Sequence, residues 1–168
     1  MGPISVEVQV DAPRERIFAF LSDLSLRPGW LGRLGRDFRL ERVDPVGVGA
    51  GARTRPGGPG VNYMGSSIVD SIQPERLEEQ GWGGPLNRVE VRTVWELIEE
   101  AGGVTKVRLT FWTAPVTILD KLRQAGRSGW WERRWRSALR EMRDAVESGQ
   151  AVERTATVAG GQRVPGAA

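Results

Sequence analysis

Hydrophobic and polar residues alternate along most of the chain as far as Trp112, a pattern typical of β-strands that bury one face. The alternation predicts strands over residues 4–10, 38–43, 52–55, 62–72, 77–82, 88–98 and 104–112. The clearest buried face lies within residues 88–98 and consists of Val89, Val91, Thr93, Trp95 and Leu97. Turn-forming glycines and prolines separate the strands, and Ala101-Gly102-Gly103 predicts a hairpin between the last two.

Two short helices are expected after the first strand. Pro13 suits the opening of a helix, because the N–H that proline lacks has no partner in the first turn. The apolar side of this helix consists of Ile17, Phe18, Phe20 and Leu21. A second short helix runs through Leu24 and Leu26 and ends before Pro28-Gly29. Trp30 then falls at a loop tip, where binding residues concentrate, or it closes over the core.

The pattern becomes helical from Pro115 onward. Ile118, Leu119 and Leu122 form one apolar face. A second apolar face follows at helical spacing and consists of Trp131, Trp135, Ala138, Leu139, Met142 and Val146. At ~100° per residue the two faces do not align, so we predict a break between Gly126 and Gly129.

The closing helix is rich in tryptophan, with Trp130, Trp131 and Trp135 close together. A curved sheet folded around such a helix would form a container for an apolar molecule. Trp131 and Trp135 lie on its inner face and Trp130 does not. We predict that a ligand contacts Trp30, Tyr63, Thr93, Trp95, Leu109, Phe111, Trp131 and Trp135. The alternative for each tryptophan is a place in the packed core, and for Tyr63 a position at the start of a strand.

The sequence contains no cysteine and no histidine. This excludes thiol nucleophiles, disulfides, zinc fingers and Ser-His-Asp triads, and we assign no metal site and no cofactor. Catalysis would depend on carboxylates, Tyr63, a lysine, an arginine or bound water. Glu90 and Glu96 fall on the exposed side of their strand, and the direction of Asp70 is undecided. No carboxylate pair is placed for acid–base work, and no catalytic residue is assigned.

Arginine dominates the basic residues, since only Lys106 and Lys121 are lysines, and the net charge is +3. Arg133, Arg136, Arg140 and Arg143 lie on one side of the closing helix and would suit phosphate groups. Acidic residues are interleaved with them, which favours an ordinary solvated face, and we do not expect nucleic-acid binding. Residues 47–52 fit the letters of a dinucleotide-binding glycine motif, but no helix can follow them, so we predict a turn.

The chain is long enough for one domain, which we place at residues 1–149. No apolar run is long enough to span a membrane. The first residues lack the features of a signal peptide, so a cytoplasmic location is expected. The glycine- and proline-rich residues 56–60 predict a mobile loop, and residues 150–168 a disordered tail. We expect a monomer or a homodimer.

The order of these segments resembles the polyketide cyclase/dehydrase branch of the START-like, Bet v 1-like (SRPBCC) superfamily. The resemblance rests on the opening APRERIFAFLSD with a following Trp, on Val46-Gly47-Val48-Gly49, and on VDSIQPERL, and it covers residues 3–148. It implies an α+β helix-grip fold, in which a curved antiparallel sheet of about seven strands wraps around a long C-terminal helix. By position, Trp30 resembles the aromatic residue at the cavity mouth of such proteins.

Three functions remain open at this point. The first is a carrier or sensor that holds a small hydrophobic molecule such as a lipid or polyketide between the sheet and the closing helix. The second, implied by the resemblance, is an aromatase/cyclase-like enzyme. The catalytic arginine of such enzymes has no clear counterpart here, because alternation places one of Arg53 and Arg55 outside or both on the convex face of the sheet. The third is a protein- or RNA-binding module that uses the arginine face.

Overall fold

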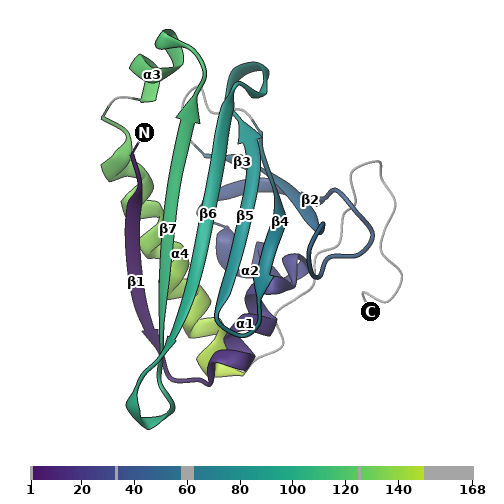
Figure 1. The fold of residues 1–168 in the computed structure, drawn as a ribbon, viewed down its shortest axis with the longest axis vertical. Coiled ribbons are helices and arrows are strands. Elements are labelled where there is room, and N and C mark those ends of the chain that lie inside the picture. The colour runs from purple at the N-terminus through teal and green to yellow at the C-terminus, as the bar shows by residue number, and fades with distance from the viewer. Residues whose placement is uncertain (1, 33, 58–62, 125, 150–168) are drawn as a thin grey trace.

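The computed structural model describes residues 2–32, 34–57, 63–124 and 126–149, and within them the chain forms one antiparallel sheet with helices on one side (Figure 1). The sheet has seven strands: β1 (Ile4–Val10), β2 (Gly35–Leu40), β3 (Gly51–Pro56), β4 (Met64–Ile72), β5 (Arg76–Gly83), β6 (Val89–Glu99) and β7 (Thr105–Pro115). Their order is β1-β7-β6-β5-β4-β3-β2. This is the helix-grip fold that the sequence resemblance implied.

The helices are α1 (Arg14–Ser22), α2 (Pro28–Leu31), α3 (Ile118–Gln124) and α4 (Ser128–Ser148), with single 3₁₀ turns at η1 (Leu24–Leu26), η2 (Pro85–Asn87) and η3 (Ala101–Gly103). Helices α1, α2 and α4 pack on the inner side of the sheet, whereas the apolar side chains of α3 are exposed. The long helix α4 lies behind β1 and β7, and α1 and α2 lie behind the middle of the sheet (Figure 1). The predicted loop at 56–60 lies largely outside the described residues, as does the tail at 150–168.

The alternation of β6 and β7 and the helical face of α4 were predicted correctly, whereas the strand predicted over residues 38–43 lies earlier in the chain, as β2. The face of β6 from Val89 to Leu97 is buried, as are the inner residues Val107, Leu109 and Phe111 of β7. The buried residues of α4 are the predicted ones, namely Trp131, Trp135, Ala138, Leu139, Met142 and Val146. The chain also breaks where the two apolar faces stop aligning, since α3 ends at Gln124 and α4 begins at Ser128.

The structure decides two points near the helices that the sequence pattern left open. Residues 28–31 form the helical turn α2, because proline is tolerated in the first turn of a helix. Trp30 lies on this turn and is fully buried, so it closes over the core, the second of the two alternatives for this residue. The apolar face of α3 is not part of the core: Ile118 is 76% exposed and Leu122 is 68% exposed. The spacing of apolar residues predicted that α3 forms, but it could not show whether another element packs against its apolar face.

The sheet bends sharply where β4 meets β5. A Cβ atom on Gly81 would lie 1.8 Å from the backbone oxygen of Gly65, so only glycine fits there. A register shift between Ile68 and Asp70 then turns β4, so that Ile68 faces the core and Asp70 is exposed. This settles the inward side of β4 and carries Ser66 toward the interior, next to β5.

Candidate functional site

A buried ion pair lies at the centre of the inner face. Arg27, which precedes α2, is 4% exposed, and Glu79 on β5 is 2% exposed. The two side chains form a fork, in which Nη1 of Arg27 donates to Oε2 of Glu79 over 2.8 Å and Nη2 donates to Oε1 over 2.6 Å. The indole Nε1 of Trp95 also donates to Oε1, and the Ser66 hydroxyl donates to Oε2. Both carboxylate oxygens are thus saturated by donors.

These partners keep Glu79 ionised. Burial by itself would raise the pKa of Glu79, but the Arg27 charge and the hydrogen bonds from Arg27, Trp95 and Ser66 outweigh burial and hold its pKa below the usual value. A carboxylate in this state has no proton to donate, and its lone pairs already accept hydrogen bonds. The pair therefore suits a structural role better than acid–base catalysis.

Six aromatic side chains run in contact from the surface to this ion pair, and we call them the aromatic row. In order they are Trp130, Trp131, Phe111, Trp135, Trp95 and Trp30, with successive ring centroids 4.8, 4.9, 5.5, 5.9 and 5.9 Å apart. The Arg27 guanidinium ends the row, 5.9 Å from the ring centres of both Trp30 and Trp95. At this level of the fold, aromatic rings fill the space between α4 and the sheet.

A groove opens at the outer end of the aromatic row. It has a volume of about 460 Å³ and is lined by Gly32, Gly35, Arg36, Gly57, Trp130, Arg133, Arg134 and Ser137. These residues come from the ends of α2 and β3, from β2 and from the first turns of α4. Arg134 is held across the groove, since it donates to the carbonyl of Gly57 over 2.9 Å and its guanidinium lies 4.7 Å from the Trp130 ring.

The structure brings most of the predicted site residues together on the inner face. Buried there are Trp30, Thr93, Trp95, Leu109, Phe111, Trp131 and Trp135. Tyr63 does not join them. It is 42% exposed and lies against Arg53 and Arg55, whose guanidinium groups are 5.7 and 5.9 Å from its ring. The buried positions of β3 alternate with these two arginines, so all three side chains face away from the core.

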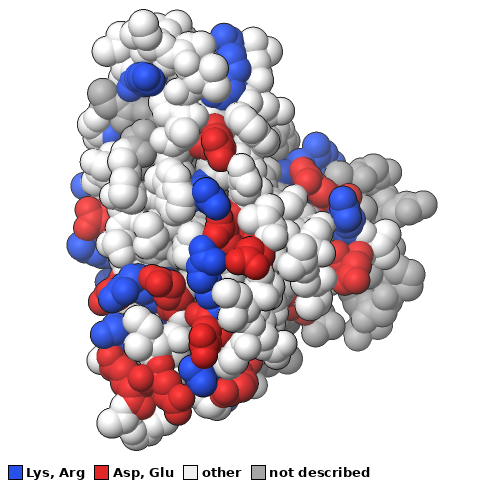
Figure 2. All heavy atoms as spheres, viewed as in Figure 1, with Lys and Arg blue, Asp and Glu red and all other residues white. Residues whose placement is uncertain are grey.

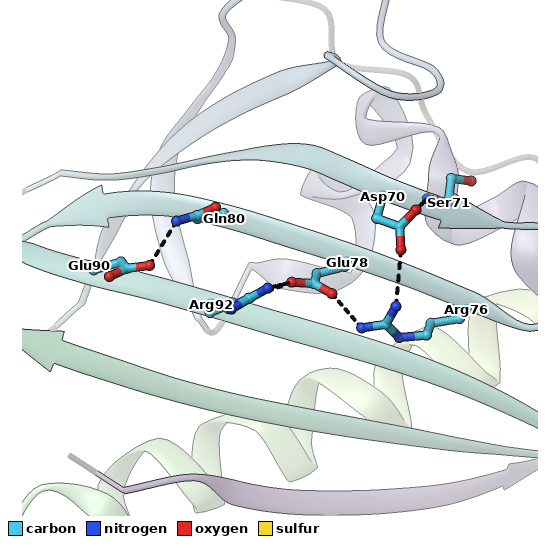
Figure 3. A network of polar contacts seen from close by, with 7 residues as sticks. All are labelled: Asp70, Ser71, Arg76, Glu78, Gln80, Glu90 and Arg92. Atoms are coloured by element: carbon cyan, nitrogen blue, oxygen red, sulfur yellow. Dashed lines mark hydrogen bonds and ion pairs between the residues drawn. The ribbon is translucent and has the colours of Figure 1, made fainter.

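The remaining candidate acids belong to the outer face of the sheet. Figure 3 shows that Arg76 bridges Asp70 and Glu78, that Arg92 also pairs with Glu78, and that Gln80 donates to Glu90. Basic and acidic side chains are intermixed over this face (Figure 2). Glu96 pairs with Arg108 in the same way. Asp70, Glu90 and Glu96 therefore each have a partner on the outer face, and they form no paired-carboxylate site.

The arginine face of α4 is partly neutralised by acids on the same helix. Arg136 pairs with Glu132, and Arg143 pairs with Asp144 and Glu147. This agrees with the solvated-face interpretation. Residues 47–50 form a turn that leads into β3 and not into a helix, so the glycine motif is followed by a strand, in agreement with the prediction of a turn. The described residues include no group of three or more acidic side chains suited to a metal ion.

Sequence reasoning did not find Arg27, Glu79 or Ser66. One signal was available, because alternation places Glu79 on the same side of β5 as the core residue Leu77. A carboxylate on an apolar face needs a partner. The identity of that partner depends on contact with a segment far away in the sequence, so it was not predictable from local pattern.

Comparisons with known proteins agree with the fold. A family model described as "Polyketide cyclase / dehydrase and lipid transport" matches residues 1–148. A search of curated proteins found no match. No helix in the described part of the chain is long and apolar enough to cross a membrane.

Several solved structures are similar in fold at low sequence identity. A hypothetical protein from Helicobacter pylori aligns with a TM-score of 0.69 at 11% identity, over 86% of this chain and 88% of that one. The major latex-like protein 151 of Panax ginseng aligns with a TM-score of 0.63 at 13% identity, over 85% of this chain and 95% of that one. DynU16, a protein from the dynemicin biosynthetic locus, aligns with a TM-score of 0.61 at 18% identity, over 88% of this chain and 48% of the DynU16 chain.

Proposed function

Because the chain belongs to the polyketide cyclase/dehydrase and lipid transport family, we propose that it binds a small hydrophobic molecule at the groove and the adjoining aromatic row, as a carrier or sensor. The observation that carries this proposal is the position of Trp130. Its ring lines the groove on one side and packs on the buried Trp131 on the other. A volume of about 460 Å³ is in the range of small-molecule sites.

Binding without catalysis fits the chemistry of the interior. In the described part of the chain, the ionisable groups at the inner end of the aromatic row are Arg27 and Glu79, and they pair with each other. Tyr63, one of the residues that could assist a cyclase-like reaction, lies on the outer side of the sheet with Arg53 and Arg55. The interior supplies apolar aromatic surface, and that surface suits retention of a molecule better than its conversion.

Titration with the neutral fluorescent probe phenylnaphthylamine tests this proposal. Wild-type protein should bind the probe, and Trp130→Ala should weaken binding about 5- to 10-fold, because an aromatic contact in a partly desolvated site contributes about 1 kcal/mol. Trp112→Ala is the matched control. Trp112 is also a half-buried tryptophan beside an arginine, but it lies on the outer face of β7 against Arg92.

Two results would count against the proposal. One is equal binding by wild type and Trp130→Ala, which would place the probe elsewhere. The other is failure of the wild type to bind any apolar probe. Extraction of the purified protein and native mass spectrometry provide an independent measurement, since a carrier should retain an apolar molecule through purification.

A further inference from the structure

Among the described residues, the lining of the groove contains several arginines and no acidic side chain. Three of its lining residues are arginines, namely Arg36, Arg133 and Arg134, and the rest are glycines, a serine and a tryptophan. This contrasts with the outer side of the sheet, where arginines face carboxylates. It also contrasts with the interior, where Glu79 neutralises Arg27.

We infer that the groove selects an organic anion: a molecule with a flat apolar body and one acidic group, such as a carboxylate, sulfonate or phosphate. This rests on the proposed function and specifies its ligand class. The apolar body lies against Trp130, and the acidic group lies among the guanidinium groups of Arg36, Arg133 and Arg134. Arginine suits this task because its planar fork donates paired hydrogen bonds to an oxyanion.

The geometry favours an anion over a cation or a neutral polar group. Arg134 is fixed between the Gly57 carbonyl and the Trp130 ring, so its charge is already oriented at the groove wall. Arg36 and Arg133 are exposed and can turn toward a bound anion.

A pair of probes that differ by one charged group tests this inference. Anilinonaphthalene sulfonate carries the same ring system as phenylnaphthylamine together with a sulfonate. Wild-type protein should bind the sulfonate at least about tenfold more tightly than the neutral probe, since hydrogen bonds to charged groups contribute about 1.5–3 kcal/mol. The preference should shrink as salt is added, because exposed charges are screened.

The variant Arg36→Gln/Arg133→Gln should remove most of the preference, because the affinity for the sulfonate should fall much further than the affinity for the neutral probe. Arg136→Gln/Arg140→Gln is the matched control. It removes the same two charges from exposed positions, but those side chains lie outside the groove lining. Both variants alter exposed residues, and thermal unfolding will confirm that they fold.

The results distinguish failure of the anion inference from failure of the proposed function. If the neutral probe binds at Trp130 and the sulfonate binds no more tightly, the inference fails while the proposed function stands. Equal losses of sulfonate affinity in the two arginine variants would also overturn the inference, because the effect would then come from net charge. If neither probe binds, both the inference and the proposed function fail.

Discussion

Replacement of Glu79 by glutamine should be one of the most destabilising single-atom changes in this protein. The carboxylate accepts hydrogen bonds from Arg27 at two atoms, from Trp95 and from Ser66. Glutamine removes the negative charge. Its NH₂ group, which is itself a donor, would face groups that donated to the carboxylate. Arg27 is only 4% exposed, so its charge cannot be rehydrated in place. Loss of one partner of a buried ion pair costs about 3–5 kcal/mol.

That cost is a large part of the total stability of an ordinary domain, which is about 5–15 kcal/mol. Chemical denaturation at neutral pH measures it directly. Glu78→Gln is the matched control. Glu78 directly precedes Glu79 in β5, and it also pairs with two arginines. Its partners Arg76 and Arg92 have side chains 36% and 41% exposed, so they regain water when the carboxylate is lost. The control should cost about 1 kcal/mol.

The pH dependence of unfolding gives a second test of the same contact. The pKa of Glu79 is lower in the folded protein than its ordinary value of 4.5, so the carboxylate contributes stability that is fully present above that value. The contribution is lost as the pH falls through the folded pKa. The difference between wild type and Glu79→Gln should therefore shrink as the pH drops below 4.5. Equal costs for Glu79→Gln and Glu78→Gln, or a difference independent of pH, would refute this reasoning.

Two further predictions concern the helices. Trp135→Ala should cost about 3–5 kcal/mol in denaturant unfolding, because Trp135 is buried between Phe111 and Trp95, whereas Trp82→Ala on the outer face should cost less than about 1 kcal/mol. Leu122→Glu should change stability by no more than about 0.5 kcal/mol, because α3 leaves that side chain exposed; a loss of several kcal/mol would mean that α3 packs on a surface in solution.

Most of the fold was predictable because its elements have local signals. Alternation in β6 and helical spacing in α4 each report which side chains share a face, and the packed core then uses those faces as expected. The order of these segments, together with short motifs such as VDSIQPERL, was enough to indicate the helix-grip fold. The structure then confirmed this fold.

The candidate site was less predictable because its parts come from segments far apart in the chain. Arg27 and Glu79 are 52 residues apart, and only the folded sheet brings them together. The exposed apolar face of α3 and the buried Trp30 show that burial is equally hard to predict from the sequence: an apolar face is left uncovered in one case, and a residue that could lie at a loop tip is covered in the other. Local spacing reports amphipathicity, but burial depends on whether another element covers the face, and one sequence contains no local signal for that.

The two ends of the aromatic row bear on how a ligand would lie. At the inner end, the Arg27 charge is balanced by Glu79 and the surrounding rings are in contact, so this end offers no uncompensated charge. At the outer end, the described lining of the groove includes three arginines and no acidic side chain. An amphiphilic anion would therefore bind with its acidic group at the groove and its apolar body toward Trp131. A body larger than the groove would have to displace Trp130 or Trp131, so the size limit of binding is set by these two side chains and not by the sheet.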